Sequence, residues 1–203
     1  MEQCHCYNDV LQRAVEGRDY CIEERLGSSG VVVMAPHGGS IEPGTDIIAK
    51  AIAGEEHAYY AFKGRLPKGN ARLHISSKRF DEPRALDLVR QSHTVVTIHG
   101  CRDDVSLVWV GGLDFRLEEE VMARLLASGL DARLSIKPGM RGIDRSNLCN
   151  RGMRGKGLQL EISKMLRFEL LRWEQGGKAW QPEPLFQTFV QIIRGCLARL
   201  NVI

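Results

Sequence analysis

The sequence has no long apolar run, no internal repeat and no low-complexity tract. Its longest apolar runs, residues 31–36 and 105–110, are far shorter than the roughly 20 residues that cross a bilayer as a helix. The first residues lack the charged start and the apolar stretch of a secretion signal. We therefore expect a protein that has no membrane partner and is cytoplasmic when it is made.

Cysteine pairs at metal-binding spacing are also missing. The six cysteines include no Cys-x-x-Cys pair, which argues against a structural four-cysteine zinc site. A chain of 203 residues can bury enough surface to fold without cross-links, so we expect reduced thiols rather than disulfides.

Neither the composition nor the net charge is extreme. Hydrophobic residues make up 43% of the chain and charged residues 26%, which excludes a disordered chain, a coiled coil and a collagen-like chain. The length, without a Pro/Ser-rich linker, predicts a single domain over residues 1–203. The 21 glycines exceed the roughly 14 expected at ~7% usage, which indicates many turns of the kind on which sites are built.

Basic residues are concentrated in one stretch, although the net charge is only +3. Residues 133–156 contain seven basic residues and a single acidic residue, Asp144. Such a stretch can attract a polyanion, or it can be a solvated loop. It holds no aromatic residue for base stacking, and the chain has no helix-turn-helix, phosphate loop or zinc-finger spacing. We therefore expect no nucleic-acid partner.

Apolar runs alternate with helical patterns along the chain. Short runs rich in β-branched residues predict strands at residues 31–36, 94–98 and 105–110. Weaker patterns predict two more strands at residues 59–63 and 73–76. Apolar periodicity and capping residues predict helices at residues 45–53, 83–91, 115–128 and 185–200. This alternation predicts an α/β fold in which helices flank an open, mixed or mainly parallel sheet.

Two of the predicted strands end directly in a histidine followed by glycine. His37 follows the strand at 31–36, and His99 follows the strand at 94–98. Ligands of open α/β sheets bind beyond the carboxyl ends of strands. Glu42 lies five residues after His37, which one tight turn can fold back. Two imidazoles and a carboxylate are a typical set of three ligands for a catalytic zinc ion.

A zinc hydrolase also needs a general base, and residues 157–163 offer one. Leu, Leu and Ile alternate there with Gln159, Glu161 and Ser163, so Glu161 lies mid-strand on the polar face. A buried carboxylate needs a partner such as a metal or a substrate, whereas an edge strand would leave this face solvated. Both interpretations remain open from the pattern alone. His74 could line the same site as a hydrogen bonder.

Nine short segments in one order resemble the signature of the poly-γ-glutamate hydrolase family of bacteria and their phages. The resemblance covers about residues 20–170. It lies on residues 35–45, 60–64, 69–70, 73–77 with 80–83, 98–101, 110–114, 147–151, 157–163 and 166–167. It implies a zinc-dependent hydrolase, with a fold similar to metallocarboxypeptidases, that cleaves the γ-linked amides of poly-γ-glutamate. Phage members clear the capsule of bacillus hosts, which implies release by host lysis.

The resemblance also implies roles for particular residues. By position, His37, Glu42 and His99 look like the ligands of one Zn²⁺ per chain, and Glu161 looks like the general base. We place substrate binding, by chemistry rather than by a match to the family, on four residues: Asn147, Asn150, Arg151 and His74. Cys101, two residues after His99, is a departure to watch, since a thiolate near zinc can compete as a ligand.

Other functions remain open at this point. The anionic polymer is the expected partner, but a zinc amidase could instead act on another acidic acyl-amino acid or peptide. A phage nucleic-acid-binding or replication accessory protein is a third, weaker hypothesis. The sequence leaves the oligomeric state open, and a monomer is compatible with it.

Overall fold

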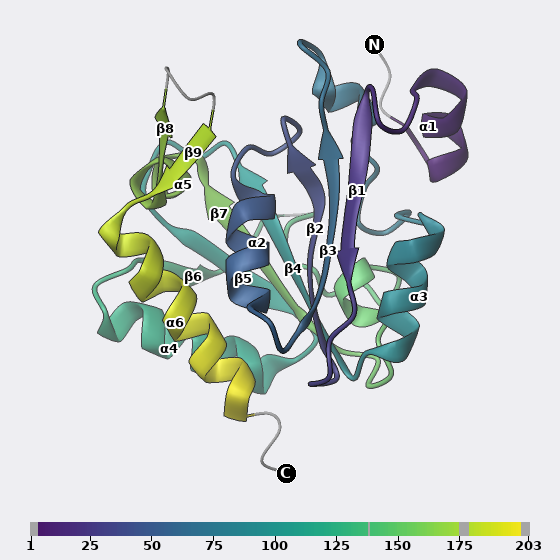
Figure 1. The fold of residues 1–203 in the computed structure, drawn as a ribbon. Coiled ribbons are helices and arrows are strands. Elements are labelled where there is room, and N and C mark those ends of the chain that lie inside the picture. The colour runs from purple at the N-terminus through teal and green to yellow at the C-terminus, as the bar shows by residue number, and fades with distance from the viewer. Residues whose placement is uncertain (1–3, 138, 175–178, 200–203) are drawn as a thin grey trace.

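The computed structural model describes residues 4–137, 139–174 and 179–199. Its centre is a seven-stranded sheet with the order β1-β3-β2-β4-β7-β5-β6 (Figure 1). Four neighbouring strands run parallel, namely β3 (Ala58–Gly64), β2 (Val31–Gly39), β4 (Thr94–Cys101) and β7 (Leu158–Ser163). On either side of these four, β1 (Tyr20–Arg25) is antiparallel to β3, and β5 (Val108–Gly112) is antiparallel to β7. The last strand, β6 (Ala132–Leu134), is parallel to β5, so the sheet is mixed and mainly parallel, as predicted.

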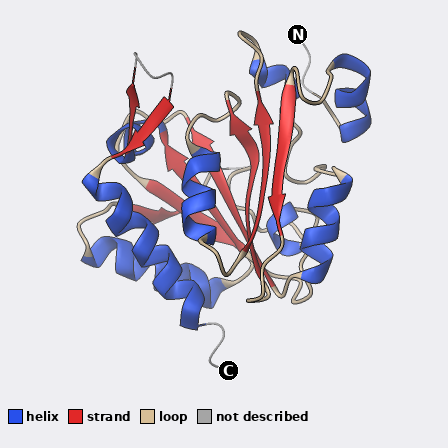
Figure 2. Cartoon of the chain, in the orientation of Figure 1, coloured by secondary structure: helices blue, strands red, loops and turns tan. Residues whose placement is uncertain are grey.

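Helices cover both faces of this sheet (Figure 2). The apolar side chains of one face pack under α2 (Thr45–Ala53), α4 (Phe115–Ala127), α5 (Lys164–Leu170) and α6 (Pro184–Ala198). Those of the other face pack under α1 (Tyr7–Arg13), α3 (Pro83–Gln91) and two short 3-10 helices, η1 (Asn70–Leu73) and η2 (Leu148–Asn150). Because both faces are covered, the central strands are apolar along most of their length.

The predicted helices are confirmed, and their capping residues explain where they begin. The Glu82 carboxylate accepts a hydrogen bond from the Ala85 amide at the start of α3, and Asp114 accepts one from the Leu117 amide at the start of α4. The helices predicted at 45–53 and 83–91 have the observed bounds, and the other two differ by one or two residues at their ends. Residue 200 of the last predicted helix lies outside the described residues.

Two strand predictions need correction. The strand predicted at 105–110 begins only at Val108, and Val105 is exposed in the preceding loop. The strand predicted at 73–76 is absent: Leu73 ends η1, and Ile75 makes an isolated bridge with Cys4. The Asn70 side chain bonds the amide and the carbonyl of Leu66, which stabilises the turn that leads into η1, so the chain reaches Leu73 as a 3-10 helix.

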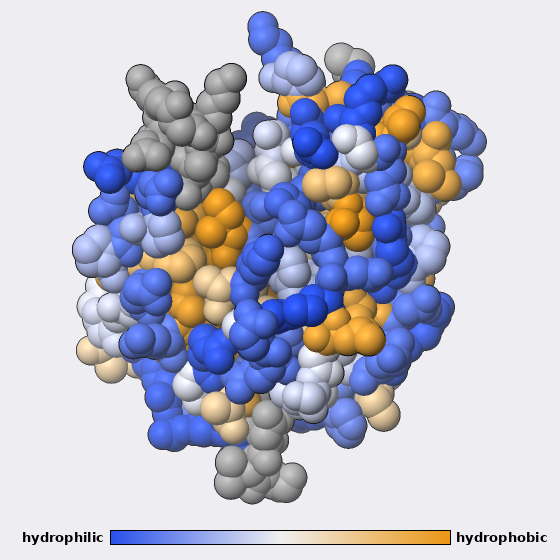
Figure 3. Space-filling view, viewed as in Figure 1, coloured by the Kyte–Doolittle hydropathy of each residue, from blue (hydrophilic) through white to orange (hydrophobic). Residues whose placement is uncertain are grey.

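The remaining elements and the surface add little to the site. A hairpin of β8 (Leu171–Glu174) and β9 (Ala179–Pro182) follows α5. Figure 3 shows one face of the molecule as mostly polar, with separate apolar patches. Among the described residues, no helix is both long enough and apolar enough to cross a membrane.

Candidate functional site

The carboxyl ends of β2 and β4 each deliver one histidine to the same edge of the sheet. His37 lies near the end of β2 and His99 near the end of β4, and each is 2% exposed. Parallel neighbouring strands bring such ends together, as the sequence predicts. The two imidazole ring centres are 4.9 Å apart.

A tight turn after β2 returns Glu42 to His37. The Glu42 amide donates to the His37 carbonyl at 2.8 Å, and the pairing of β2 with β3 shifts register between Ala35 and Gly38. Gly39 has a φ of +62°, and a side chain there would collide with the carbonyl oxygen of Gly64. The turn therefore requires glycine both for its backbone angle and for this close approach.

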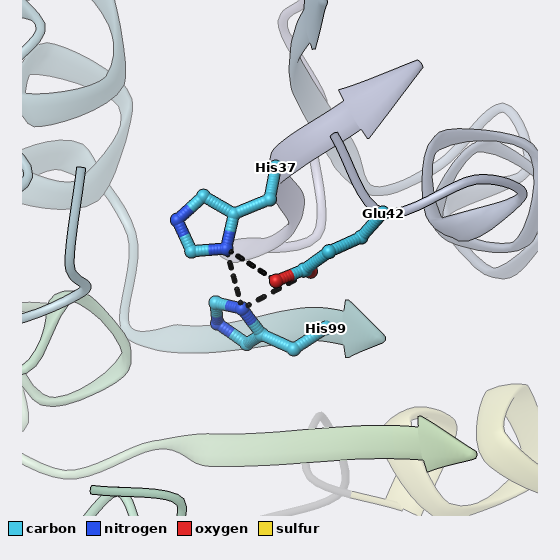
Figure 4. Close-up of side chains that lie close together, drawn as sticks. All are labelled: His37, Glu42 and His99. Atoms are coloured by element: carbon cyan, nitrogen blue, oxygen red, sulfur yellow. Dashed lines mark hydrogen bonds and ion pairs between the residues drawn. The ribbon is translucent and has the colours of Figure 1, made fainter. Parts of the chain in front are cut away.

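Three side chains converge beside this turn, those of His37, Glu42 and His99 (Figure 4). His37 Nδ1 lies 2.9 Å from Glu42 Oε1 and 3.1 Å from His99 Nδ1, and His99 Nδ1 lies 3.7 Å from Glu42 Oε2. One potential ligand atom from each residue lies within 4.8 Å of the others. Ligand atoms around a tetrahedral zinc ion with bonds near 2.0–2.1 Å are roughly 3.3 Å apart, so the observed spacing suits that ion.

The outer nitrogens of both rings have hydrogen-bond partners. His37 Nε2 lies 2.7 Å from the Ile75 carbonyl oxygen, which can only accept, so Nε2 carries a proton. His99 Nε2 lies 3.2 Å from Ser77 Oγ, a hydroxyl that can accept from it or donate to it. Both Nδ1 atoms face each other and the Glu42 carboxylate. A shared proton or a metal cation can occupy the space between these three groups, and zinc is a metal that this donor set favours.

The carboxylate of Glu42 is held in its charged form. Burial opposes the charge, but the imidazoles of His37 and His99 more than offset burial and lower the pKa of Glu42. The Gly100 amide also donates to Glu42 Oε2 at 2.8 Å. Glu42 is therefore an anion at neutral pH, as a metal ligand must be.

Glu161 lies beside this group on the neighbouring strand. β7 is a central strand, which excludes the edge-strand interpretation, and Glu161 is in register with His99. The Gln159 amide group donates to Glu161 Oε1 at 3.1 Å. Burial raises the pKa of Glu161 to about 7, and the negative charge of Glu42 adds to the rise. A carboxylate with this pKa can take up and release a proton near neutral pH.

The asparagines predicted to bind substrate are buried and bonded within the chain. Asn147 Nδ2 donates to Gln159 Oε1 at 2.9 Å, so it supports the glutamine that contacts Glu161. Asn150 Oδ1 accepts from the amides of Leu113 and Gly157, which ties three segments together. Their roles in substrate binding stay predictions.

Arg151 is likewise occupied by the backbone. Its guanidinium donates to carbonyl oxygens of two neighbouring loops, namely those of Ser146, Phe80, Ser77 and Lys78. These bonds tie η2 to the turn that holds Ser77 beside His99. A role in binding a substrate carboxylate stays a prediction for Arg151 too.

His74 lies against the candidate metal-ligand group, namely His37, Glu42 and His99. Its ring centre is 3.9 Å from that of His37, and its Nε2 is 4.0 Å from Glu42 Oε1. Burial, followed by the nearby charge of His37, lowers the pKa of His74 to about 3, so the ring is neutral. Its Nδ1 is buried with no hydrogen-bond partner, and 26% of the side chain is exposed. His74 thus lies beside the predicted metal ligands, and its contact with substrate stays a prediction.

Three supporting residues were not predicted. Ser77 bonds His99, and Gln159 bonds Glu161. Arg167 of α5 donates to the carbonyls of Cys101 and Ile162 and occupies the space above Gly100, where a side chain would collide with it. Gln159 shares the polar face of the 157–163 pattern with Glu161, which was a usable signal. Ser77 and Arg167 come from other segments and leave no such pattern.

Cys101 does not join the metal-ligand group. Its thiol donates to Asp103 at 3.7 Å, and burial raises its pKa to about 11. A protonated thiol is a poor metal ligand. All six cysteines are free in the structure.

Known proteins resemble this chain over most of its length. A family model described as poly-gamma-glutamate hydrolase matches residues 5–192. In Bacillus subtilis strain 168, the UPF0714 protein YndL is 33% identical over 163 residues, and the SPbeta prophage-derived UPF0714 protein YoqZ is 32% identical over 165 residues. These matches cover 80% of this chain in each case, but only 64% of YndL and 60% of YoqZ, so the chain spans less than two thirds of either relative.

Two solved structures share the fold closely. The structure of a bacteriophage poly-gamma-glutamate hydrolase superposes with a TM-score of 0.92 at 28% identity and covers 98% of both chains. A structure of YndL described as zinc-free superposes with a TM-score of 0.91 at 28% identity, over 98% of this chain and 99% of that one.

Proposed function

The chain belongs to the poly-γ-glutamate hydrolase family, and from this premise we propose that it is a zinc-dependent hydrolase that cleaves the γ-glutamyl amide bonds of poly-γ-glutamate. One observation carries the proposal: the potential ligand atoms of His37, Glu42 and His99 converge beside a half-buried carboxylate, Glu161. The zinc-free description of the YndL structure supports zinc as the metal.

His37, Glu42 and His99 would hold the metal through Nδ1, a carboxylate oxygen and Nδ1. When bound, zinc acts as a Lewis acid that polarises the amide carbonyl and acidifies the attacking water. The chain prepares this site through outer contacts, since Ile75 and Ser77 bond the outer nitrogens of the two imidazoles. Such outer contacts fix ring orientation and ligand basicity.

Glu161 would move the proton. As the water oxygen bonds to the carbonyl carbon, a Glu161 carboxylate oxygen accepts the proton that the water loses. As the carbon–nitrogen bond breaks, the same oxygen gives the proton to the departing amine nitrogen. A pKa of about 7 suits both directions of transfer at neutral pH. The bond from Gln159 orients the carboxylate for this task.

The negative charge of the polymer is opposite to that of the basic stretch at residues 133–156. Poly-γ-glutamate carries a free carboxylate on every unit, and residues 133–156 contain seven basic residues. Among the residues predicted to bind substrate, His74 contacts a proposed metal ligand, since its ring centre lies 3.9 Å from that of His37. We propose that it faces the substrate from beside the metal.

The biological setting that fits these relatives is removal of a capsule by a phage or prophage enzyme. One related structure is a bacteriophage hydrolase, and one related chain is prophage-derived. We propose synthesis in the cytoplasm and release when the host lyses.

The test is the substitution Glu161→Gln in zinc-loaded protein. Glutamine keeps the shape of the side chain but cannot accept the proton, so kcat on purified poly-γ-glutamate should fall 10²- to 10⁴-fold. Amine groups released from the polymer measure the rate, and elemental analysis measures zinc, which should be retained.

Glu169→Gln is the matched control, because Glu169 is a carboxylate on α5 that contacts only Ser106 among the interactions described. It should keep wild-type kcat. Near-normal turnover of Glu161→Gln would exclude Glu161 as the base, and loss of zinc would make it a ligand instead. A wild-type enzyme that cleaves N-acylglutamates or short peptides but not the polymer would favour the zinc amidase alternative.

A further inference from the structure

A row of four side chains crosses the sheet at the level of Glu161. His99 on β4 is in register with Glu161 on β7, Glu161 with Trp109 on β5, and Trp109 with Arg133 on β6. Residues directly paired across strands point to the same face. Glu161 therefore lies between a metal-ligating histidine and an indole, with neighbouring strands ~4.8 Å apart.

The indole of Trp109 is fixed by two charged residues. Trp109 Nε1 donates to Asp103 Oδ2 at 2.6 Å, and Lys137 Nζ donates to both oxygens of Asp103 at 2.6 and 2.8 Å. Lys137 Nζ also lies 5.1 Å from the centre of the Trp109 ring, within the range of a cation–π contact. Asp103 thus holds the Trp109 indole and the Lys137 ammonium group next to each other.

We propose that Trp109 and Lys137 form the subsite for the glutamyl unit that adjoins the scissile amide on the β5 side, with the indole under its methylene groups and the ammonium on its α-carboxylate. This subsite rests on the proposed function. In this subsite, Lys137 favours γ-linked chains that carry free α-carboxylates over chains in which these groups are neutral.

The dimensions of the polymer suit this placement. A γ-linked glutamyl unit has five backbone atoms, which span roughly 6 Å when extended. A polymer that lies along this row with its scissile amide between His99 and Glu161 has its next unit above Trp109, about one strand spacing beyond Glu161. The two methylene groups of that unit are apolar and suit the indole face, and its carboxylate suits an ammonium.

Lys137 has a donor available for this role. An ammonium group has three N–H donors, and two of them are directed at Asp103. The Lys137 side chain is 42% exposed. Arg133, the next residue of the row, lies one strand farther from Glu161 than Trp109 does.

The experiment compares two substrates in wild-type and Lys137→Met protein. One substrate is a γ-linked glutamate oligomer with free α-carboxylates, and the other is the same oligomer with α-carboxamides. Lys137→Met keeps the apolar stem but removes the charge, so kcat/KM on the carboxylate oligomer should fall about 10- to 100-fold. Zinc content and kcat/KM on the carboxamide oligomer should stay at wild-type values, and Lys137→Arg should restore part of the loss.

Lys164→Met is the matched control, since Lys164 is another half-exposed lysine that pairs with a nearby aspartate, Asp104. It should leave the ratio of the two kcat/KM values unchanged. An equal loss on both substrates, or no loss, in Lys137→Met would overturn the subsite while leaving the proposed function intact.

A binding measurement separates the two proposals further. Calorimetric titration of the carboxylate oligomer into Glu161→Gln protein should show binding that Lys137→Met in the same background weakens about 10- to 100-fold. If wild-type protein binds the oligomer through Lys137 but cleaves neither substrate, the proposed hydrolysis fails, and Lys137 is part of a binding site for the anionic chain and not of a subsite beside a scissile amide. If it neither binds nor cleaves, both fail.

Discussion

Glu118 is a buried carboxyl group that lies outside the site and works against the stability of the fold. It lies in the first turns of α4, where it is 9% exposed. Burial raises its pKa to about 7 from an ordinary value of 4.5, and the positive charge of Arg141 only partly opposes this rise. The folded state therefore binds a proton more tightly than the unfolded state does.

The sign of the pH dependence follows from this shift. Below about pH 4.5 the group is protonated in both states and costs nothing, whereas above pH 7 the folded state must hold a buried charge. Glu118→Gln should raise the free energy of unfolding by about 1–2 kcal/mol at pH 8, since one pKa unit corresponds to about 1.4 kcal/mol and partial exposure reduces the effect. The gain should vanish near pH 4.

Urea unfolding at pH 4 and pH 8 checks this prediction. Glu119→Gln is the control, because Glu119 is the exposed neighbour on the same helix, and it should change little at either pH. An equal gain for Glu118→Gln at both pH values would mean that the effect comes from packing and not from charge.

At the scale of elements, the turn at residues 76–80 connects His99, a proposed metal ligand, to the loop that ends in η2. Ser77 bonds His99 through its hydroxyl, and its carbonyl accepts from the Leu148 amide at 2.9 Å. Arg151 adds bonds to the carbonyls of Ser77, Lys78 and Phe80. The position of the His99 ring therefore depends on a segment that is distant in sequence.

Arg151→Lys tests whether this arginine serves the fold or the substrate. A lysine ammonium cannot reach four carbonyl groups in the fixed geometry of a guanidinium, so we expect a loss of about 1–3 kcal/mol in the free energy of unfolding. Thermal unfolding measures the loss, and polymer kinetics are measured on the same protein. Unchanged stability with a raised KM would instead support the predicted contact with a substrate carboxylate.

Elements with strong local patterns could be predicted from the sequence. The capped helices α3 and α4 and the β-branched strands β2 and β4 follow from residues within each segment, because local propensity and burial agree there. The edge strands β1 and β6 and the seven-residue helix α5 were missed. They are short or mixed in polarity, and pairing with a distant strand or packing on the core decides their structure.

Some features of the site could likewise be predicted from the sequence, and others could not. His37, Glu42 and His99 could be predicted because two strand ends and one glycine turn fix their positions. The partners of Asn147, Asn150 and Arg151 could not, because each of these side chains bonds backbone or side-chain groups of segments that only the folded loop brings near. Polar side chains beside a site can equally bind substrate or hold a loop, and sequence spacing does not distinguish the two.

At the scale of the whole molecule, metal binding should be coupled to stability. Zinc that binds only the folded chain stabilises it by about 4 kcal/mol at a free concentration of 1,000 times Kd. For a chain of 203 residues, 1 kcal/mol raises Tm by roughly 2–4 °C. Zinc should therefore raise Tm by about 10 °C, and a chelator should reverse the rise.

His99→Ala is the variant that locates this effect. It should remain folded without zinc and lose most of the rise in Tm, while Glu161→Gln should keep the rise. Differential scanning calorimetry with zinc, with magnesium and with chelator makes the comparison. A full zinc response in His99→Ala would place the ion elsewhere in the molecule.

One short segment, residues 75–77, supplies the outer hydrogen-bond partner of both imidazoles. A ring flip of either histidine would break that bond and exchange a nitrogen for a carbon at the inner position, so both rings should be immobile even before a metal arrives. In nuclear magnetic resonance, the two Nε2 protons should then exchange slowly with solvent and resonate far downfield in metal-free protein. Metal capture in such a site requires little reorganisation of the chain, so its rate should be limited by ion desolvation rather than by side-chain motion.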